Sequence, residues 1–115
     1  MPKVPKGVRP ESAPAAVVLS VTRLGANIAS ARIKRQWRQQ DLANKAGVSR
    51  PVVIRIESGH LGVGIGAYVA VLWAMGLHRD IAELASAERD LEGQTLAAAR
   101  LGKRVRPSTE RDDDF

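Results

Sequence analysis

The stretch QDLANKAGVSRPVVIRIESG, residues 40–59, decides the fold of this chain. Together with Gln39 it predicts two short helices joined by a tight turn. Leu42, Ala43 and Ala46 form the apolar side of the first helix at helical spacing. Val53 and Ile56, three residues apart, form the apolar side of the second. Each helix therefore has one side that needs cover and one that faces outward.

The residues of the turn suit this arrangement. Gly47 stands where the first helix must end, since glycine adopts the left-handed conformation without a Cβ clash. Ser49 is a good N-cap for the second helix, and Pro51 is tolerated in its first turn. Val48 and Val53 have the spacing of a hydrophobic staple. Helix, glycine turn and helix make the helix-turn-helix arrangement, whose second helix enters the major groove of DNA.

Length and composition narrow the class of protein. The chain has 115 residues, enough for one domain with tails, and 44% of them are hydrophobic. There is no cysteine and there are only two histidines, so neither a disulfide nor a metal site is expected, and no cofactor is indicated. No long apolar segment resembling a signal peptide begins the chain, and the apolar run over residues 61–77 contains four glycines. The expectation is a cytoplasmic, nucleoid-associated protein without a membrane span.

The net charge of +6 is concentrated in one part of the chain. Residues 23–57 hold eight Lys and Arg against one Asp and one Glu, a net +6, whereas residues 1–22 carry +2, residues 58–106 carry +1 and residues 107–115 carry −3. The positive excess therefore lies on the helix-turn-helix and the segment before it, as expected for a protein that binds a polyanion. The alternative is an ordinary solvated basic surface.

Three regions are expected along the chain. Residues 1–14 are proline-rich and basic and predict a flexible arm, which is either a disordered tail or a contact to DNA. Residues 15–85 form the helix-turn-helix domain. Its first confident helix is Leu24 to about Arg35, while Ala15 to Val21 fits either a helix or a short strand that pairs across a dimer. Residues 86–115 form an extension that is partly helical and then disordered.

The helix expected at Ile65 to Met75 carries no charged residue at all. A helix that is apolar all round must be covered all round, and a small domain covers only part of it, so a homodimer is expected. The predicted dimer interface is Tyr68, Val71, Leu72, Trp73 and Met75. The glycines before this helix follow a helix rather than a strand and lack the lysine of a phosphate-binding loop, so they predict a turn. A short last helix is expected at Asp80 to Ala85, with Ile81 and Leu84 facing inward.

The extension is less regular. Leu91, Thr95 and Ala98 or Ala99 give a weak helical stripe over Ser86 to Leu101, and a short basic run follows. The acidic end, which closes with Phe115, is either a solvated tail or a peptide that anchors a partner.

The pattern that runs from Gln39 through Leu42, Ala43 and Ala46–Arg50 to Ile54, Ile56, Glu57 and Gly59 resembles the Xre/Cro-type family of bacterial and phage repressors. The resemblance covers roughly residues 24–78. It implies an all-α, lambda-repressor-like bundle of five helices that binds operator DNA as a dimer. The family usually has Ser or Thr where Arg38 stands and often a polar residue where Pro51 stands, which leaves the helix cap and a base contact at these positions unexplained.

A second, shorter resemblance involves Ile65 to Leu77 and Glu88 to Arg106, which are similar to the corresponding segments of HipB-like antitoxins. It implies the antitoxin of a HipBA-like module, which would repress its own operon and bind a HipA-like kinase toxin. One alternative is a stand-alone Xre-type regulator. Another is a protein-interaction module that keeps the helix-turn-helix shape.

The predicted DNA contacts follow from the second helix, residues 49–57. Because Val53 and Ile56 face the core, Arg50, Pro51, Val52 and Arg55 are predicted to contact bases. Arginine can donate two hydrogen bonds to a guanine. The predicted phosphate contacts, on the helix ends and the loop after Gly59, are Arg38, Gln39, Lys45, Ser49, Ser58, Gly59 and His60. The contact of Gln39 is carried over from the family.

Arg32 and Glu57 match a pair of residues in the family that links the first helix to the end of the DNA-contacting helix, residues 49–57. They are predicted to form a structural ion pair. No nucleophile stands with a base and no paired carboxylates share a predicted cleft, so no catalytic residue is assigned and an enzyme is not expected.

Overall fold

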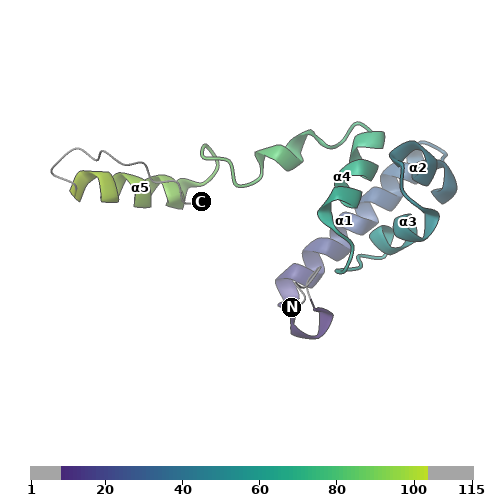
Figure 1. Cartoon of the computed structure of the whole chain (residues 1–115), viewed down its shortest axis with the longest axis horizontal. Coiled ribbons are helices and arrows are strands. Elements are labelled where there is room, and N and C mark those ends of the chain that lie inside the picture. The colour runs from purple at the N-terminus through teal and green to yellow at the C-terminus, as the bar shows by residue number, and fades with distance from the viewer. Residues whose placement is uncertain (1–8, 104–115) are drawn as a thin grey trace, which may run out of the picture. The chain divides into compact units, whose positions relative to one another are not determined.

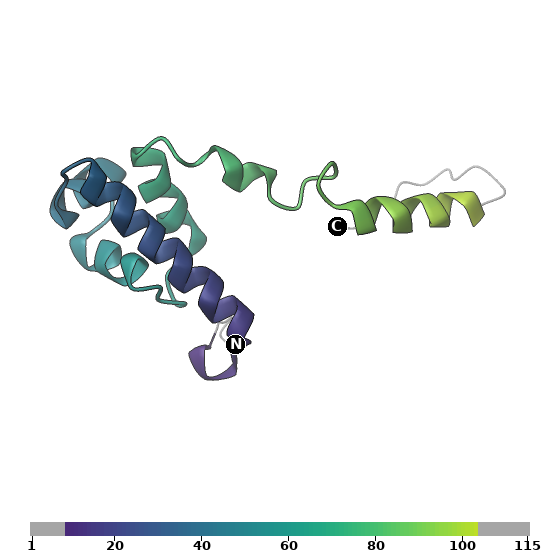
Figure 2. The same ribbon diagram turned by 180° about the vertical axis from the view of Figure 1, so that it is seen from behind.

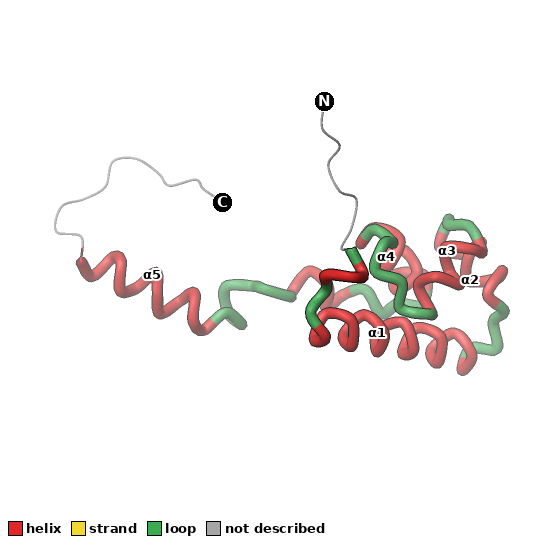
Figure 3. The backbone as a smooth tube through the Cα atoms, turned by 90° about the horizontal axis from the view of Figure 1, so that it is seen from below, coloured by secondary structure: helices red, strands yellow, loops and turns green. Residues whose placement is uncertain are grey.

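The computed structural model describes residues 9–103. All regular secondary structure within this range is helical, with no strand (Figures 1 and 3). It contains two short 3-10 helices and five α-helices. In chain order these are η1 (Pro10–Ser12), α1 (Ala15–Lys34), α2 (Gln39–Ala46), α3 (Arg50–Glu57), α4 (Ile65–Ala74), η2 (Arg79–Glu83) and α5 (Leu91–Lys103). The predicted all-α fold class is confirmed.

The chain divides into two compact units, one that ends at Ile81 and one that begins at Ala82. In the first unit, α3 packs against both α1 and α2, and α2 also packs against α4. The long helix α1 runs along one side of the three shorter helices (Figures 2 and 3). Buried side chains from all four helices form one core: Ile28, Leu42, Ala43, Val53, Ile56, Tyr68, Val71, Leu72 and Met75.

The first helix is longer than predicted. It begins at Ala15 rather than near Leu24, so the possible strand at Ala15 to Val21 is excluded. Val21 and Leu24 pack against the core at the same helical face as Ile28. The β-branched and alanine residues of this segment favour neither a strand nor a helix clearly. Packing of one helical face against the core therefore makes the segment a helix.

Backbone contact between α1 and the end of α3 depends on a small residue. A Cβ built at Gly25 would lie 2.3 Å from the carbonyl oxygen of Ile56 and 3.0 Å from that of Glu57. Glycine at this point lets the two backbones approach within a distance that no larger residue permits. This close approach fixes the end of α3 beside the middle of α1.

The helices α1 to α4 are each followed by a residue in the left-handed conformation. Gly47, after α2, has φ 74°, as the turn of the helix-turn-helix predicts. Gln36, after α1, has φ 60° although it is not glycine. The N–H of Trp37 donates to the carbonyl of Arg32 across this turn, at 3.2 Å, and the chain then enters α2.

The expected last helix of the core is a 3-10 helix, η2. Ile81 packs against the core as predicted, but Leu84 lies after η2 and is exposed, so its predicted inward position is wrong. In the second unit, α5 confirms helix formation in the extension and continues through Gly93. Of the predicted arm, residues 1–14, the first eight lie outside the described residues, and Pro10–Ser12 form η1. The acidic end at Phe115 also lies outside the described residues.

Candidate nucleic-acid interface

The recognition helix α3 has the cap and the buried face that its sequence predicts. Ser49 is its N-cap, and the Ser49 hydroxyl accepts a hydrogen bond from the N–H of Val52 at 3.4 Å. Pro51 lies in the first turn, where its missing N–H costs no helical bond. Val53 and Ile56 are both 0% exposed. One side of α3 is therefore packed into the core, and the other side is exposed on the surface of the domain.

The predicted base-contacting residues fall into two groups. Arg50, Pro51 and Arg55 are exposed, so their side chains are free to meet another molecule. Val52 is half-buried and packs against the core, so less of its side chain is available to another molecule. Ile54, which the same pattern places towards the groove or its edge, is also exposed on this helix.

The start of α2 has a partial cap that the sequence did not predict. The backbone N–H of Arg38 donates to Asp41 Oδ2 at 2.7 Å, and Arg38 Nε lies 3.4 Å from the same oxygen. The backbone hydrogen bond, followed by the side-chain one, holds the pKa of the Asp41 carboxyl below its usual value. The third residue of the helix thus compensates for an arginine at the N-cap, because arginine has no acceptor for the helix N–H groups.

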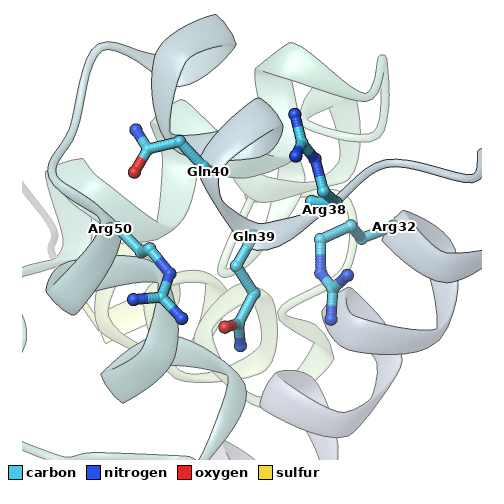
Figure 4. Close-up of a pocket in the computed structure, with 5 residues that line it drawn as sticks. All are labelled: Arg32, Arg38, Gln39, Gln40 and Arg50. Atoms are coloured by element: carbon cyan, nitrogen blue, oxygen red, sulfur yellow. The ribbon is translucent and has the colours of Figure 1, made fainter.

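A pocket of about 440 Å³ opens beside the first turns of α2 and α3 (Figure 4). It is lined by Arg32, Arg38, Gln39, Gln40 and Arg50. Arg32, Gln39 and Arg50 extend the same way in the close-up view, whereas Arg38 extends the opposite way. Arg32 and Arg38 are paired with Glu57 and Asp41, so Arg50 is the arginine of this pocket that could meet an anion beside the helix N-termini.

One carboxylate ties these helices together. Glu57 Oε2 accepts from Arg32 Nε at 2.6 Å, and Glu57 Oε1 accepts from the Arg32 Nη2 group at 3.0 Å. Gln39 Nε2 donates to the same Oε1 at 3.1 Å, and Arg32 Nη1 donates to the carbonyl of Trp37 at 2.8 Å. The side chains of Arg32 and Glu57 are only 13% and 8% exposed. The structure therefore brings the predicted pair together as a largely buried ion pair, and the hydrogen bond to Glu57 raises the pKa of Arg32.

The other predicted phosphate contacts have different surroundings. Lys45 places its Nζ 4.7 Å from the centre of the Trp37 ring, a cation–π contact. The Ser58 hydroxyl donates to the carbonyl of Arg55 at 3.0 Å. Gly59 has φ 77° and is half-buried. His60 is exposed, and its Nδ1 accepts from the N–H of Gly62 at 2.9 Å.

The structure corrects most of the predicted dimer interface. Tyr68, Val71, Leu72 and Met75 are 7% exposed or less within a single chain, because the core of α1–α4 covers this side of α4. These four are core residues of one chain, so they do not form an interface surface. Trp73 is 58% exposed and is the one predicted interface residue that a second chain could reach without opening the core.

Two polar residues of this region were missed from the sequence. Gln40 lines the pocket, and its Nε2 donates to Asn44 within α2 at 2.9 Å. Arg35 donates to the carbonyl of Met75 at 3.1 Å and so ties the end of α1 to the end of α4. The position of Gln40 in the first turn of α2 could have indicated that it lines the pocket. The hydrogen bond of Arg35 joins residues forty apart in the sequence, so no local pattern indicates it.

Residues 28–84 match a family model described as helix-turn-helix. This segment, 57 of the 115 residues, is similar to helix-turn-helix domains of the Xre/lambda-repressor-like kind. The match begins in α1 and ends just after η2, and it contains α2, α3 and the pocket between them. A match to this family indicates a DNA-binding transcription regulator, and proteins of the family are typically not enzymes.

Searches of curated proteins and of solved structures found no match to the chain. Among the described residues, no group of three potential metal ligands comes together, and none of the helices has the length and apolar character needed to span a bilayer.

Proposed function

We propose that the helix-turn-helix domain binds operator DNA with α3 in the major groove, where Arg50 and Arg55 read bases. The observation that carries this proposal is the exposure of both arginines on a helix whose Val53 and Ile56 are fully buried. The core fixes α3 in place, so its cations project from a rigid element. Pro51 and Val52 would lie at the same groove and contact it through apolar atoms, such as a thymine methyl group.

The phosphate contacts would come from around this helix. Arg38 is exposed beside the start of α2, and the first N–H groups of that helix have no helical partner. Gln39, Ser49, Ser58, Gly59 and His60 lie at the helix ends and in the loop after α3. Lys45 would contribute charge while it stays stacked on Trp37. These contacts would position the domain, and Arg50 and Arg55 would provide the specificity.

Selection of duplexes from a random pool by the full chain tests this proposal, followed by affinity measurements for Arg50→Ala and Arg55→Ala. Each variant should lose discrimination at one base pair per half-site, by about 1–3 kcal/mol. Affinity should also fall steeply with salt, because bound arginines and lysines release counterions. Arg89→Ala is the matched control, since Arg89 is exposed in the second unit. Equal weakening for all duplexes would make both residues phosphate contacts, and a flat salt response would contradict the assignment.

A homodimer is the second part of the proposal. The outer side of α4 carries Ile65 and Trp73, both exposed, with exposed Leu77 just beyond the helix. These side chains are apolar, and no charged residue lies between them in the sequence. Burial of such a patch against its copy would place two recognition helices on one duplex. Trp73→Glu should then yield a monomer in sedimentation experiments, and an unchanged oligomeric state would exclude this surface.

The finer assignment is a repressor that also serves as the antitoxin of a HipBA-like module. It rests on the resemblance of Ile65 to Leu77 and Glu88 to Arg106 to HipB-like antitoxins. It is also supported by α5, where Leu91, Leu96 and Leu101 are exposed and available to a protein partner such as a HipA-like kinase toxin. Capture of the full chain from its host, with identification of bound protein and DNA, separates the candidates. DNA alone would indicate a stand-alone Xre-type regulator, and protein alone an interaction module.

A further inference from the structure

His60, in the loop after α3, is anchored through its backbone to two helices. Its N–H donates to the carbonyl of Arg55 at 3.0 Å, and its own carbonyl accepts from the Tyr68 hydroxyl at 3.0 Å. Tyr68 is only 7% exposed, so the second bond connects the loop to the core side of α4. The backbone of His60 therefore has a fixed place beside the end of the recognition helix, while the residue itself is exposed.

The imidazole ring of His60 also has a fixed partner. The N–H of Gly62 donates to His60 Nδ1 at 2.9 Å. A Cβ built at Gly62 would lie 3.0 Å from Cε1 and 3.3 Å from Nδ1 of this ring, so glycine lets the ring rest against the loop backbone. Because an amide N–H can only donate, Nδ1 carries no proton and is the acceptor. The ring in this arrangement is neutral, and its one N–H is at Nε2.

The other donors of Ser58, Gly59 and His60 are already used within the domain. The N–H groups of Ser58 and Gly59 donate to the carbonyls of Ile54 and Ile56, at 3.1 and 3.0 Å. The Ser58 hydroxyl donates to the carbonyl of Arg55. A phosphate is an acceptor, so it needs a donor that is still free. Among these three loop residues, the described part of the chain leaves free the Nε2–H of His60.

We propose that His60 binds a DNA phosphate as a neutral donor, through Nε2–H, and that Gly62 positions it by holding Nδ1. This inference rests on the proposed function of α3 and gives the charge state of one of its phosphate contacts. The contact differs from that of an arginine or a lysine, because a neutral ring displaces no counterion from the duplex. It adds a directional hydrogen bond whose contribution stays nearly constant as salt is raised.

Such a contact would fix the position of α3 along the duplex. The backbone of His60 is bonded to α3 at Arg55 and to α4 at Tyr68, so a phosphate held at Nε2 is linked to both helices. Arg55 is itself one of the two arginines proposed to read bases. A phosphate contact carries no sequence information, but it determines where the neighbouring base-reading side chains lie in the groove.

The first test is the ¹⁵N NMR spectrum of the histidine rings in the full chain at pH 8, without DNA. The chain has two histidines, so His60→Ala assigns the signals. Nδ1 of His60 should resonate as a nitrogen without a proton, and Nε2 as a nitrogen that carries one. A proton on Nδ1 would overturn the inference, because Gly62 could not then donate to it.

The second test is the affinity of the full chain for a duplex selected from a random pool, measured over a range of salt concentrations. His60→Ala should weaken binding about 3- to 10-fold, the effect of one hydrogen bond, and leave the slope of log affinity against log salt unchanged. His60→Lys should recover affinity at low salt but steepen this slope by about 0.9, since lysine displaces one counterion. A slope that becomes shallower by about 0.9 in His60→Ala would show a charged contact and refute the proposal.

Gly62→Ala tests the positioning role. The new methyl group would crowd the His60 ring, so affinity should fall, and no further loss should appear in the His60→Ala background. Gly64→Ala is the matched control, because Gly64 also lies between α3 and α4 but has nothing within 4 Å of its Cβ position. Equal affinities of the two glycine variants would exclude Gly62 from the contact. If the chain selects a duplex but His60→Ala has no effect, this inference fails and the proposed function stands. If the chain selects no duplex at all, both fail.

Discussion

Replacement of Gly25 by alanine should separate α1 from α3. In the middle of a helix, alanine is intrinsically better than glycine by about 1 kcal/mol, so propensity alone predicts a more stable protein. The structure predicts the opposite, because the new Cβ would lie 2.3 Å from the carbonyl oxygen of Ile56 and 3.0 Å from the N atom of Gly59. All the nearest atoms belong to the backbone and cannot rotate away.

The size of the effect follows from what must move. An ordinary contact would require α1 to shift by roughly 1 Å from α3, which loosens the packing of Ile28 against the core. Overpacking of this kind costs about 1–3 kcal/mol, and a clash with backbone belongs at the upper end. After the gain in propensity, the net loss should be about 2 kcal/mol. For a domain of this size, that lowers Tm by roughly 8–16 °C.

Thermal and urea unfolding of the full chain measure this change, and Gly66→Ala is the matched control. Gly66 also lies in a helix, but nothing stands within 4 Å of the position of its Cβ, so the control should be as stable as the original chain or slightly more stable. Stabilisation by both substitutions would refute the reasoning, because helix propensity would then outweigh the contact between α1 and α3.

Three further predictions concern single side chains. Glu57→Ala should lower the free energy of unfolding in urea by about 3 kcal/mol, because it leaves the largely buried Arg32 without its carboxylate. Glu83→Ala, at an exposed position, is the control and should change this free energy little. A loss below about 1 kcal/mol for Glu57→Ala would place the pair among surface ion pairs. Asp41→Ala should lower Tm at pH 7 but not in acid: the folded-state pKa lies below the usual 3.8, so the ionised carboxyl stabilises above that value and its contribution disappears as pH falls below it. An equal effect at pH 7 and pH 2 would contradict this assignment. Gln36→Gly should raise stability by about 0.5–1 kcal/mol, since φ 60° strains any residue with a Cβ; a lower Tm would show that the Gln36 side chain contributes more than this strain.

The sequence by itself determined the helix-turn-helix unit. Gly47, Ser49 and the spacing of Leu42, Val53 and Ile56 specify two capped helices, a turn and their inner faces, because all these signals act within a few residues. The concentration of charge on the same segment was equally visible. Local chemistry is enough for such features, since the residues that interact are neighbours along the chain.

Only the tertiary structure decided which surfaces remain free. The sequence of α4 shows that it is apolar all round, but not that the core covers Tyr68 and Val71 while Trp73 stays exposed. Likewise, no local pattern places Gln39 against Glu57, eighteen residues away, or sets the orientation of its carboxamide. Periodicity reports how much apolar or polar surface an element carries, whereas the neighbour that meets each side depends on how distant segments pack.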